Sequence, residues 1–379
     1  MELDEELRDC VQWLRKHLSF DIDGDVQTFE AVIRMVGGLI AGYYATGEPA
    51  LLGAARGLAD RLLPAFTKSP SGVPYRFVNL RTGTVSGSVT NLAEAGSNIL
   101  EFGELSRLTG NPKYFAVAKQ AYRAVIRQRS YIDLLGSEFD VERGKFVATD
   151  SGAPNPPDDS FYEYLYGAWR MFGDADARDW YRLLTDAILK RQQVLIGSEL
   201  WFAQVDQRTG ARTEHQTQSE LGAFYAELLA KGGDRSIGER YFDSWTVIAE
   251  KYGLIPEQID YRDHSIIDPA YLLRPEYANS AFDLWFLTGS QKYRKTAYAH
   301  FRALRTHCRV AGGYATISDV RTSPMARGDL FPSYSFSENF KYLYMTFADA
   351  PRFNGKNYYL STEGKILRGL LPRTEAPRQ

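Results

Sequence analysis

The sequence predicts an all-α fold, an (α/α) barrel of helix pairs, from three observations. A helix-ending turn recurs about every sixty residues. The helix before each turn is apolar on most faces, whereas the helix after it is amphipathic. The long returns between pairs carry strand-turn-strand patterns at one end. Two concentric helix layers explain why every first helix is more apolar than every second one, and an open solenoid does not.

Each turn has the chemistry of one helix ending and another beginning. A glycine takes the left-handed conformation that ends a helix, and a following Asn, Asp or Ser caps the next one. The helix pairs are exemplified by the apolar Phe282–Leu287 and the amphipathic Lys113–Arg123. The six turns are Ala45–Pro49, Leu108–Pro112, Phe172–Asp174, Gly232–Asp234, Leu287–Ser290 and Phe347–Pro351.

The returns predict short β-hairpins at one end of the barrel. Alternating residues surround a glycine turn in Val78–Thr84, Val141–Val147 and Val205–Ala211. Loops this long within a compact domain are usually functional. No linker composition divides the chain, so residues 1–370 are predicted to form one barrel domain, followed by a loose tail over 371–379.

Composition excludes several function classes. The 379 residues hold 45 Lys+Arg against 47 Asp+Glu, a net charge of -2, which argues against a nucleic-acid binder. No apolar run is long enough to span a membrane, and the acidic start shows no secretory signal. Cys10 and Cys308 offer neither a disulfide framework nor metal-ligand spacing. The compartment is not determined by these features.

An acidic residue precedes each turn by about one helix length. One such acid alone is best explained as a residue at a helix start, where the helix dipole stabilises its negative charge. The aligned set instead predicts several carboxyls facing one cavity. There, neighbouring charges and burial can raise the pKa of one carboxyl and leave another ionised, as acid and base roles require. Paired carboxyls beside aromatic residues are the side chains that glycoside hydrolysis uses. The acids are Glu30, Glu94, Asp159, Glu220, Glu276 and Glu338.

Other chemistries are not supported. The five histidines form no zinc-protease pattern. Gly37-Gly38 follows no strand, so it is not a phosphate loop, and no Gly-x-Ser-x-Gly elbow occurs. His215, beside Glu214, is open to a structural or a functional interpretation.

Several ordered motifs make the chain resemble the class I α-mannosidases, glycoside hydrolase family 47. This resemblance implies a calcium-dependent, inverting hydrolase of α-1,2-linked mannose on an (α/α)7 barrel. It runs from about Arg8 to Glu363. The motifs are Phe29–Leu39, Leu62–Phe66, Leu92–Glu94, Leu100–Leu105, Asp159–Leu165, Leu272–Glu276, Glu338–Tyr344 and Ser361–Glu363.

The resemblance also implies residue roles. Glu30 resembles the general acid, Glu276 the base that activates water, and Asp159 a third essential carboxylate. Thr362 resembles the direct Ca²⁺ ligand, through its hydroxyl and carbonyl oxygens. Tyr334 resembles the aromatic that stacks under the terminal sugar. The residues expected to bind the sugar or the waters around the metal are Arg34, Glu94, His215, Arg274, Tyr334, Glu338 and Glu363.

The chain departs from the family pattern at several places. The family's Asn-Thr-Glu-Ala-His-Pro is here Ser361–Ile366, and Asn279 and Pro157 replace a usual Glu and Arg. Gln218 stands at the family disulfide position. The chain begins with an expected outer helix, Leu7–Leu18, so the first inner helix of the barrel is expected to be missing and the chain to be truncated at its start.

Three functions remain open. The first is an exo-α-1,2-mannosidase acting on oligomannose glycans with Ca²⁺, and the second is a mannose-binding barrel with little or no turnover. The third, a helical interaction scaffold, predicts salt-bridged acids and a plugged barrel. In each case we expect no nucleic-acid partner, no integral membrane segment and a monomer.

Overall fold

The computed structural model describes residues 3–349 and 359–368, and the chain divides into two compact units. Unit 1 comprises the described residues of Met1–Thr149, Ser160–Leu184 and Ala350–Gln379, and unit 2 comprises Asp150–Asp159 and Thr185–Asp349. The single domain over 1–370 stays a prediction. The tail expected over 371–379 lies outside the described residues.

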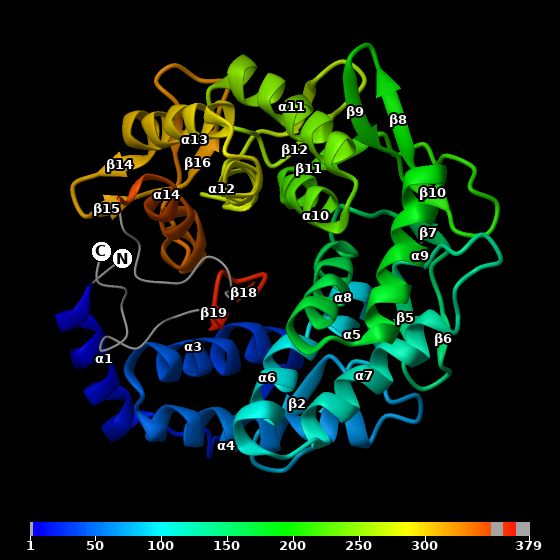
Figure 1. Ribbon diagram of the computed structural model, residues 1–379, viewed down its shortest axis with the longest axis vertical. Helices are drawn as coiled ribbons and strands as arrows, with labels where there is room; N and C mark the ends of the chain where they lie inside the picture. Colours follow the sequence, from blue (N-terminus) through cyan, green and yellow to red (C-terminus); the bar gives the residue numbers. More distant parts are fainter. Residues whose placement is uncertain (1–2, 350–358, 369–379) are drawn as a thin grey trace. The chain divides into compact units, whose positions relative to one another are not determined.

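Unit 1 consists mainly of helices, with a π-helical turn, η1, following the short helix α2 (Figure 1). Helices α3 and α4 pack against each other, as do α6 and α7. The helices are α1 (Asp4–His17), α2 (Thr28–Glu30), η1 (Ala31–Val36), α3 (Gly37–Thr46), α4 (Pro49–Thr67), α5 (Leu92–Gly96), α6 (Ile99–Thr109), α7 (Lys113–Ile126), and all but the first residue of α8 (Asp159–Phe172) with the first part of α9 (Ala175–Arg191).

Unit 2 has two layers of helices. Helices α10, α12 and α14 pack side by side, and α11 and α13 flank them (Figure 1). The helices are η2 (Glu220–Phe224), α10 (Tyr225–Gly232), α11 (Arg235–Tyr252), α12 (Glu276–Thr288), α13 (Gln291–Ala303), η3 (Leu304–Cys308), η4 (Ser335–Asn339) and α14 (Phe340–Phe347).

Burial confirms the predicted difference between the helices of a pair. In α12, every residue of Tyr277–Leu284 is buried, because the helix is enclosed by protein on most faces. In α13, only Tyr293, Ala297 and His300 are buried, along one stripe. The predicted turns at Gly110 and Gly289 are also confirmed, since both glycines have φ of 68°, the left-handed conformation that ends a helix. The sixth predicted turn, Phe347–Pro351, lies partly outside the described residues.

Small antiparallel sheets form the returns, as predicted. The strands of unit 1 are β1 (Asp25–Gln27), β2 (Phe77–Asn79), β3 (Val85–Ser86), β4 (Val89–Asn91), β5 (Glu138–Asp140), β6 (Lys145–Phe146), β18 (Tyr359–Leu360) and β19 (Ile366–Arg368). Sheets β1-β2-β3 and β4-β5-β6 each lead into a helix start. In the first, Phe77 pairs with Ser86 and Val78 with Val85.

The strands of unit 2 likewise connect helix pairs. Sheet β11-β12-β13 has three strands, and the other sheets have two. Its register places Ser219 opposite Gln258. The strands are β7 (Asp150–Ser151), β8 (Gln193–Ile196), β9 (Glu199–Phe202), β10 (Val205–Asp206), β11 (Thr217–Ser219), β12 (Gln258–Asp260), β13 (Ser265–Asp268), β14 (Arg309–Val310), β15 (Gly313–Tyr314), β16 (Ile317–Asp319) and β17 (Ala326–Arg327).

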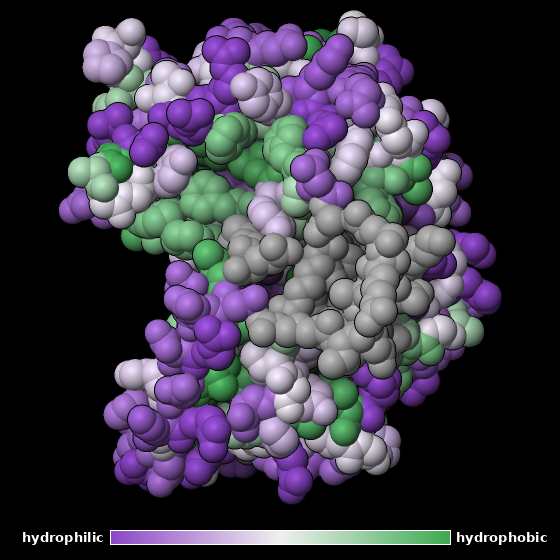
Figure 2. Space-filling model, turned by 60° about the vertical axis from the view of Figure 1, so that its left-hand side comes forward, coloured by the Kyte–Doolittle hydropathy of each residue, from purple (hydrophilic) through white to green (hydrophobic). Residues whose placement is uncertain are grey.

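The face of the molecule seen in Figure 2 is largely polar, with patches of apolar side chains. Exposed aromatic residues of unit 2 include Phe286 on α12, Tyr298 on α13 and Phe336 in η4. No helix in the described ranges is both long enough and apolar enough to cross a membrane.

The packing of α11 on α10 gives a stability prediction. A Cβ added at Gly238 would lie 2.3 Å from the carbonyl oxygen of Ala226 and 3.0 Å from the backbone nitrogen of Ala230. Backbone atoms cannot yield as a flexible side chain can. We therefore expect Gly238→Ala to lower the free energy of unfolding by roughly 2 kcal/mol, measured by urea denaturation.

Gly57 on α4 provides the matched control. A Cβ there meets no atom within 4 Å, so Gly57→Ala should raise the free energy of unfolding by about 0.5–1 kcal/mol through helix propensity. Equal effects of the two substitutions would contradict the described helix packing.

Candidate active site

The acids aligned in the sequence lie at or close to helix starts. Glu276, Glu220 and Asp159 are the first residues of α12, η2 and α8, and Glu94 is in the first turn of α5. Glu30 ends α2 and is followed by the π-helical turn η1, while Glu338 lies in the π-helical turn η4. Single π-helical turns occur frequently at functional sites.

In unit 1, one guanidinium joins two of the predicted site carboxyls. Arg34 lies one turn after Glu30, and its Nε forms an ion pair with the Glu30 carboxylate. Its Nη1 lies 2.5 Å from Oε2 of Glu363, whose side chain is 10% exposed. Because the guanidinium is a planar fork, Arg34 can hold both carboxylates at once.

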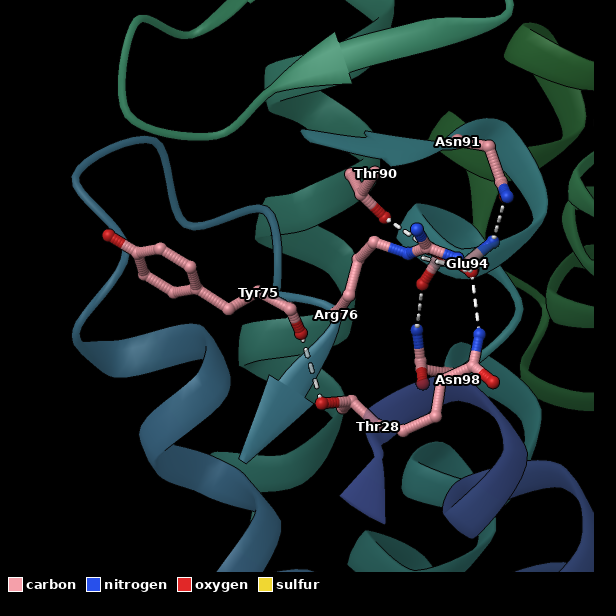
Figure 3. A network of polar contacts seen from close by, with 8 residues as sticks. Thr28, Tyr75, Arg76, Thr90, Asn91, Glu94 and Asn98 are labelled. Carbon is pink, nitrogen blue, oxygen red and sulfur yellow. Dashed lines mark hydrogen bonds and ion pairs between the residues drawn. The ribbon is translucent and has the colours of Figure 1, made fainter. Parts of the chain in front are cut away.

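Glu94 is the centre of a second network in unit 1 (Figure 3). Arg76 donates from Nε to Oε2 at 2.8 Å and from Nη2 to Oε1 at 2.9 Å. Gln27 donates to Oε1 at 2.6 Å and Thr90 to Oε2 at 3.0 Å, while Asn91 accepts from the backbone N–H of Glu94. The carboxylate therefore has its acceptor sites engaged by the chain itself and joins β1, the Arg76 segment and β4 to α5.

Glu101 on α6 is a buried acid for which the sequence suggested no role. It is fully buried, its Oε1 accepts from the Tyr164 hydroxyl at 2.9 Å, and its Oε2 has no partner. Burial raises the pKa of Glu101 to about 8. Only packing of α8 on α6 brings Tyr164 to it, so no local sequence signal could have found it.

Thr362 lies in the tight turn between β18 and β19. Gly364 has φ of 61°, and its N–H donates to the Ser361 carbonyl at 2.7 Å. Lys365 N–H donates to the Ser361 hydroxyl at 3.3 Å. Within the ranges the structure describes, no group of three or more His, Cys, Asp or Glu side chains is arranged to hold a metal. Thr362 contributes a hydroxyl and a carbonyl oxygen to the turn, and a hard cation prefers oxygen ligands.

In unit 2, Glu276 has an unpartnered oxygen at the start of α12. Its Oε2 is buried and makes no hydrogen bond. Burial raises the pKa of Glu276 to about 8, although the positive charge of Arg274 opposes the shift. Asp159 is close enough for its charge to add to the increase. A carboxyl perturbed by burial and by named charges is a candidate for acid or base chemistry.

Arg274 is held in place by Glu257 and Tyr334. Its Nε lies 3.0 Å from Oε1 and 3.1 Å from Oε2 of Glu257, and its Nη2 lies 2.5 Å from Oε1. Its guanidinium carbon is 5.5 Å from the centre of the Tyr334 ring, a cation–π distance. The Tyr334 hydroxyl donates to the Leu272 carbonyl at 2.7 Å. The position of Tyr334, the predicted sugar platform, is therefore fixed.

Buried side chains also fix the backbone that leads to Glu276. Leu273 has φ of 61°, a conformation rare for a residue with a side chain. Asn339 donates to the carbonyls of Leu273 and Arg274 at 3.2 and 3.0 Å, and the Tyr271 hydroxyl donates to the Arg274 carbonyl at 3.2 Å. Strain held by such a network is typical of a functional segment.

The remaining predicted site residues have different surroundings. Asp159 follows Asp158, a fully buried acid whose Oδ2 accepts from the Gly152 N–H at 2.8 Å and whose pKa burial raises to about 8. Glu338 is buried. His215 is exposed, with Glu214, in the loop between β10 and β11.

Carboxyls at helix starts, with the Tyr334 ring held near Glu276, are side chains of the type that glycoside hydrolases use as acid and base. A family model described as Glycosyl hydrolase family 47 matches residues 1–369, and the chain belongs to that family. The resemblance noted from the motifs is therefore confirmed.

Individual relatives agree with this. The chain is 36% identical over 380 residues to alpha-mannosidase I MNS5 of Arabidopsis thaliana, a match that covers 95% of this chain and 63% of that protein. It is 32% identical over 397 residues to mannosyl-oligosaccharide 1,2-alpha-mannosidase IA of Sus scrofa, covering 97% of this chain and 59% of that one. The chain thus spans about three fifths of the length of these relatives.

A solved structure confirms the fold class. The alpha-1,2-mannosidase from Trichoderma reesei matches with a TM-score of 0.86 at 24% identity, covering 96% of this chain and 86% of that one. The predicted all-α barrel class with short hairpins is therefore correct.

The raised pKa of Glu276 predicts a pH-dependent stability. Its pKa is 4.5 in an unfolded chain and about 8 when folded, so between these values the unfolded chain releases a proton that the folded protein keeps. Stability contributed by the protonated group is complete below about pH 4.5 and is lost as the pH rises to about 8. Relative to Glu276→Gln, the parent protein should lose more than about 1 kcal/mol of unfolding free energy across this range, measured by urea denaturation.

The control is Glu5→Gln, which changes an acid exposed on α1. It should follow the parent at every pH. A constant difference between the parent and Glu276→Gln from pH 4.5 to 8 would contradict the burial of a protonated Glu276.

Proposed function

We propose that the chain is an inverting exo-α-1,2-mannosidase that releases terminal α-1,2-linked mannose from oligomannose glycans with the assistance of Ca²⁺. The observation that carries this proposal is the environment of Glu276, a buried carboxyl with a free oxygen beside a fixed arginine and a fixed tyrosine ring. The substrate class is supported by the similarity to the α-1,2-mannosidases of Sus scrofa and Trichoderma reesei.

Glu276 is assigned as the general base. A base that activates water must be ionised and must have a free acceptor, and Oε2 is that acceptor. Burial opposes the ionised form, and Arg274 is the charge that favours it. Glu257 keeps the Arg274 guanidinium in one orientation through both of its oxygens. This gives Glu257 a supporting function in the same reaction.

Glu30 is assigned as the general acid that protonates the leaving oxygen, with Arg34 orienting its carboxyl through their ion pair. Asp159, at the start of α8, is assigned as the third essential carboxylate. Its charge acts on Glu276. Tyr334 supplies a flat apolar surface for a sugar ring, with one edge fixed by its hydroxyl.

Thr362 would hold Ca²⁺ through its hydroxyl and carbonyl oxygens. When bound, the cation supplies positive charge that polarises water and orients sugar hydroxyls. Glu363, fixed by Arg34, lies next to Thr362 in the chain and can accept hydrogen bonds from water or from a sugar. The absence of a carboxylate cluster among the described residues fits a cation that retains several waters.

Hydrolysis of α-1,2-mannobiose tests the proposal directly. The parent protein with CaCl₂ should release mannose, and Glu276→Gln should lower kcat at least 100-fold, because the amide cannot accept a proton from water. The change in kcat should exceed the change in KM, since the base acts in the transition state.

The matched control for this assay is Glu142→Gln. Glu142 accepts a hydrogen bond from Tyr75 at 3.1 Å and is placed in no site. It should retain the parent rate within about twofold. A folded, calcium-loaded parent that releases no mannose, or equal rates for the parent and Glu276→Gln, would refute the assignment.

Calcium binding gives an independent test. Thr362→Val keeps the shape of the side chain and removes its hydroxyl, so it should weaken Ca²⁺ binding at least tenfold in a calorimetric titration of the metal alone. Thr322→Val is the control, because Thr322 lies in an exposed turn and its hydroxyl donates to the Asp319 carbonyl. Identical calcium affinities for Thr362→Val and the parent would contradict a metal site in this turn.

A mannose-binding barrel without useful turnover is the second candidate. The altered sequence Ser361–Ile366 around Thr362 favours it. Calorimetry that detects mannobiose binding, combined with no product after prolonged incubation, would select this candidate over the hydrolase.

A further inference from the structure

Glu220 is a fully buried acid in unit 2 for which the proposed reaction gives no role. It is the first residue of η2, its relative exposure is 0%, and neither of its carboxyl oxygens has a hydrogen-bond partner among the described residues. A carboxylate buried in this way would lack both a cation and a hydrogen-bond donor. Such a group is strongly destabilising unless it takes up a proton.

The backbone fixes Glu220 next to the Arg274 cluster. Its N–H donates to the carbonyl of Glu257 at 3.0 Å, and the preceding Ser219 pairs with Gln258 in the β11-β12 ladder. Glu257 is also the residue whose carboxylate binds Arg274. Thus one strand pairing places Glu220 beside the ion pair that leads to Glu276.

The cluster has more acids than cations. Arg274 is the cation that faces the group, and both oxygens of Glu257 already bind it. The charges of Glu257 and Glu276 both disfavour ionisation of Glu220. The titratable and charged groups that interact with Glu220 come from the surrounding segments of unit 2 and are Glu257, Tyr271, Arg274, Glu276, Cys308 and Tyr334.

The positive charge of Arg274 does not favour the ionised forms of Glu220 and Glu276 equally. The Arg274 charge is the largest influence that counteracts the effect of burial on the pKa of Glu276. It is the smallest of the four influences on the pKa of Glu220. Burial raises the pKa of Glu220 well above its usual value. When one of the two acids Glu220 and Glu276 loses its proton, the negative charge therefore forms on Glu276.

We propose that Glu220 is a positioning residue that remains a protonated carboxylic acid. Of the two acids beside the Arg274–Glu257 pair, Glu276 is then the one that ionises and can act as a base. A second anion at Glu220 would hinder the ionisation of Glu276. The consequence for activity rests on the proposed function, but the protonation state itself does not.

Infrared spectroscopy of the full chain tests the protonation state without any substrate. A protonated carboxylic acid has a carbonyl stretching band separate from the bands of carboxylates. At pH 7, the difference spectrum between the parent and Glu220→Gln should show the loss of one such band. Glu104→Gln is the control, because Glu104 is equally buried but its carboxyl pairs with the Arg107 guanidinium at 2.7 Å, so its loss should remove no protonated-acid band. A difference spectrum in which no protonated-acid band is lost from the parent to Glu220→Gln would overturn the proposal.

The pH dependence of mannobiose hydrolysis gives the second measurement. If Glu220 is neutral, Glu220→Gln leaves the charge around Glu276 unchanged, and the midpoint of the acid limb of kcat/KM should stay within about 0.3 pH units of the parent. If Glu220 is ionised in the parent, its loss would move this midpoint to lower pH by one unit or more, which would overturn the proposal. A parent without hydrolysis refutes the proposed function and leaves the infrared result to decide the inference.

A second variant guards against misfolding of Glu220→Gln. Glu220→Leu replaces the acid with an apolar side chain of similar size. Because the neutral carboxyl has no partner to lose, the thermal unfolding midpoint should stay equal or rise. A fall of more than about 8 °C would show that the carboxyl makes a stabilising contact and would count against the proposal.

Discussion

The ion pair between Arg274 and Glu257 is the interaction on which the candidate base depends. It fixes a positive charge two residues before Glu276, and this charge is the largest influence that favours the ionised form of the Glu276 carboxyl. In unit 1, the guanidiniums of Arg34 and Arg76 likewise form ion pairs with carboxylates. Among the described residues, buried carboxyl oxygens that lack a hydrogen-bond partner include those of Glu101, Asp158, Glu220 and Glu276, and there a proton or chemistry must compensate.

Local sequence chemistry was sufficient to predict the fold class. Glycine turns such as Gly110 and Gly289 end helices through their own backbone conformation, so they are visible without any knowledge of tertiary contacts. The same holds for the buried helix Tyr277–Leu284 and for the hairpin in which Val78 pairs with Val85. The count of seven pairs came from the resemblance to a family, which the family model and the match to a solved barrel enzyme confirm.

The partners of the site residues could not be predicted, because packing rather than sequence spacing selects them. Glu94 and Gln27 are 67 residues apart, and Glu101 and Tyr164 are 63 apart. Glu94 was expected to bind sugar or metal-bound water, yet five hydrogen bonds from the chain occupy its carboxylate. His215, expected at a pocket wall, lies in an exposed loop. These roles stay predictions, but the surroundings of Glu276 now give the assignment of a base a physical basis.

In the proposed reaction, Glu276 activates water for a single displacement that inverts the sugar configuration. The most direct measurement is proton NMR of α-1,2-mannobiose during the first minutes of hydrolysis, before the released mannose equilibrates between its anomers. Inversion predicts that β-mannose is the first product. The appearance of α-mannose first would show retention through a covalent intermediate and would contradict the role of Glu276 as a general base.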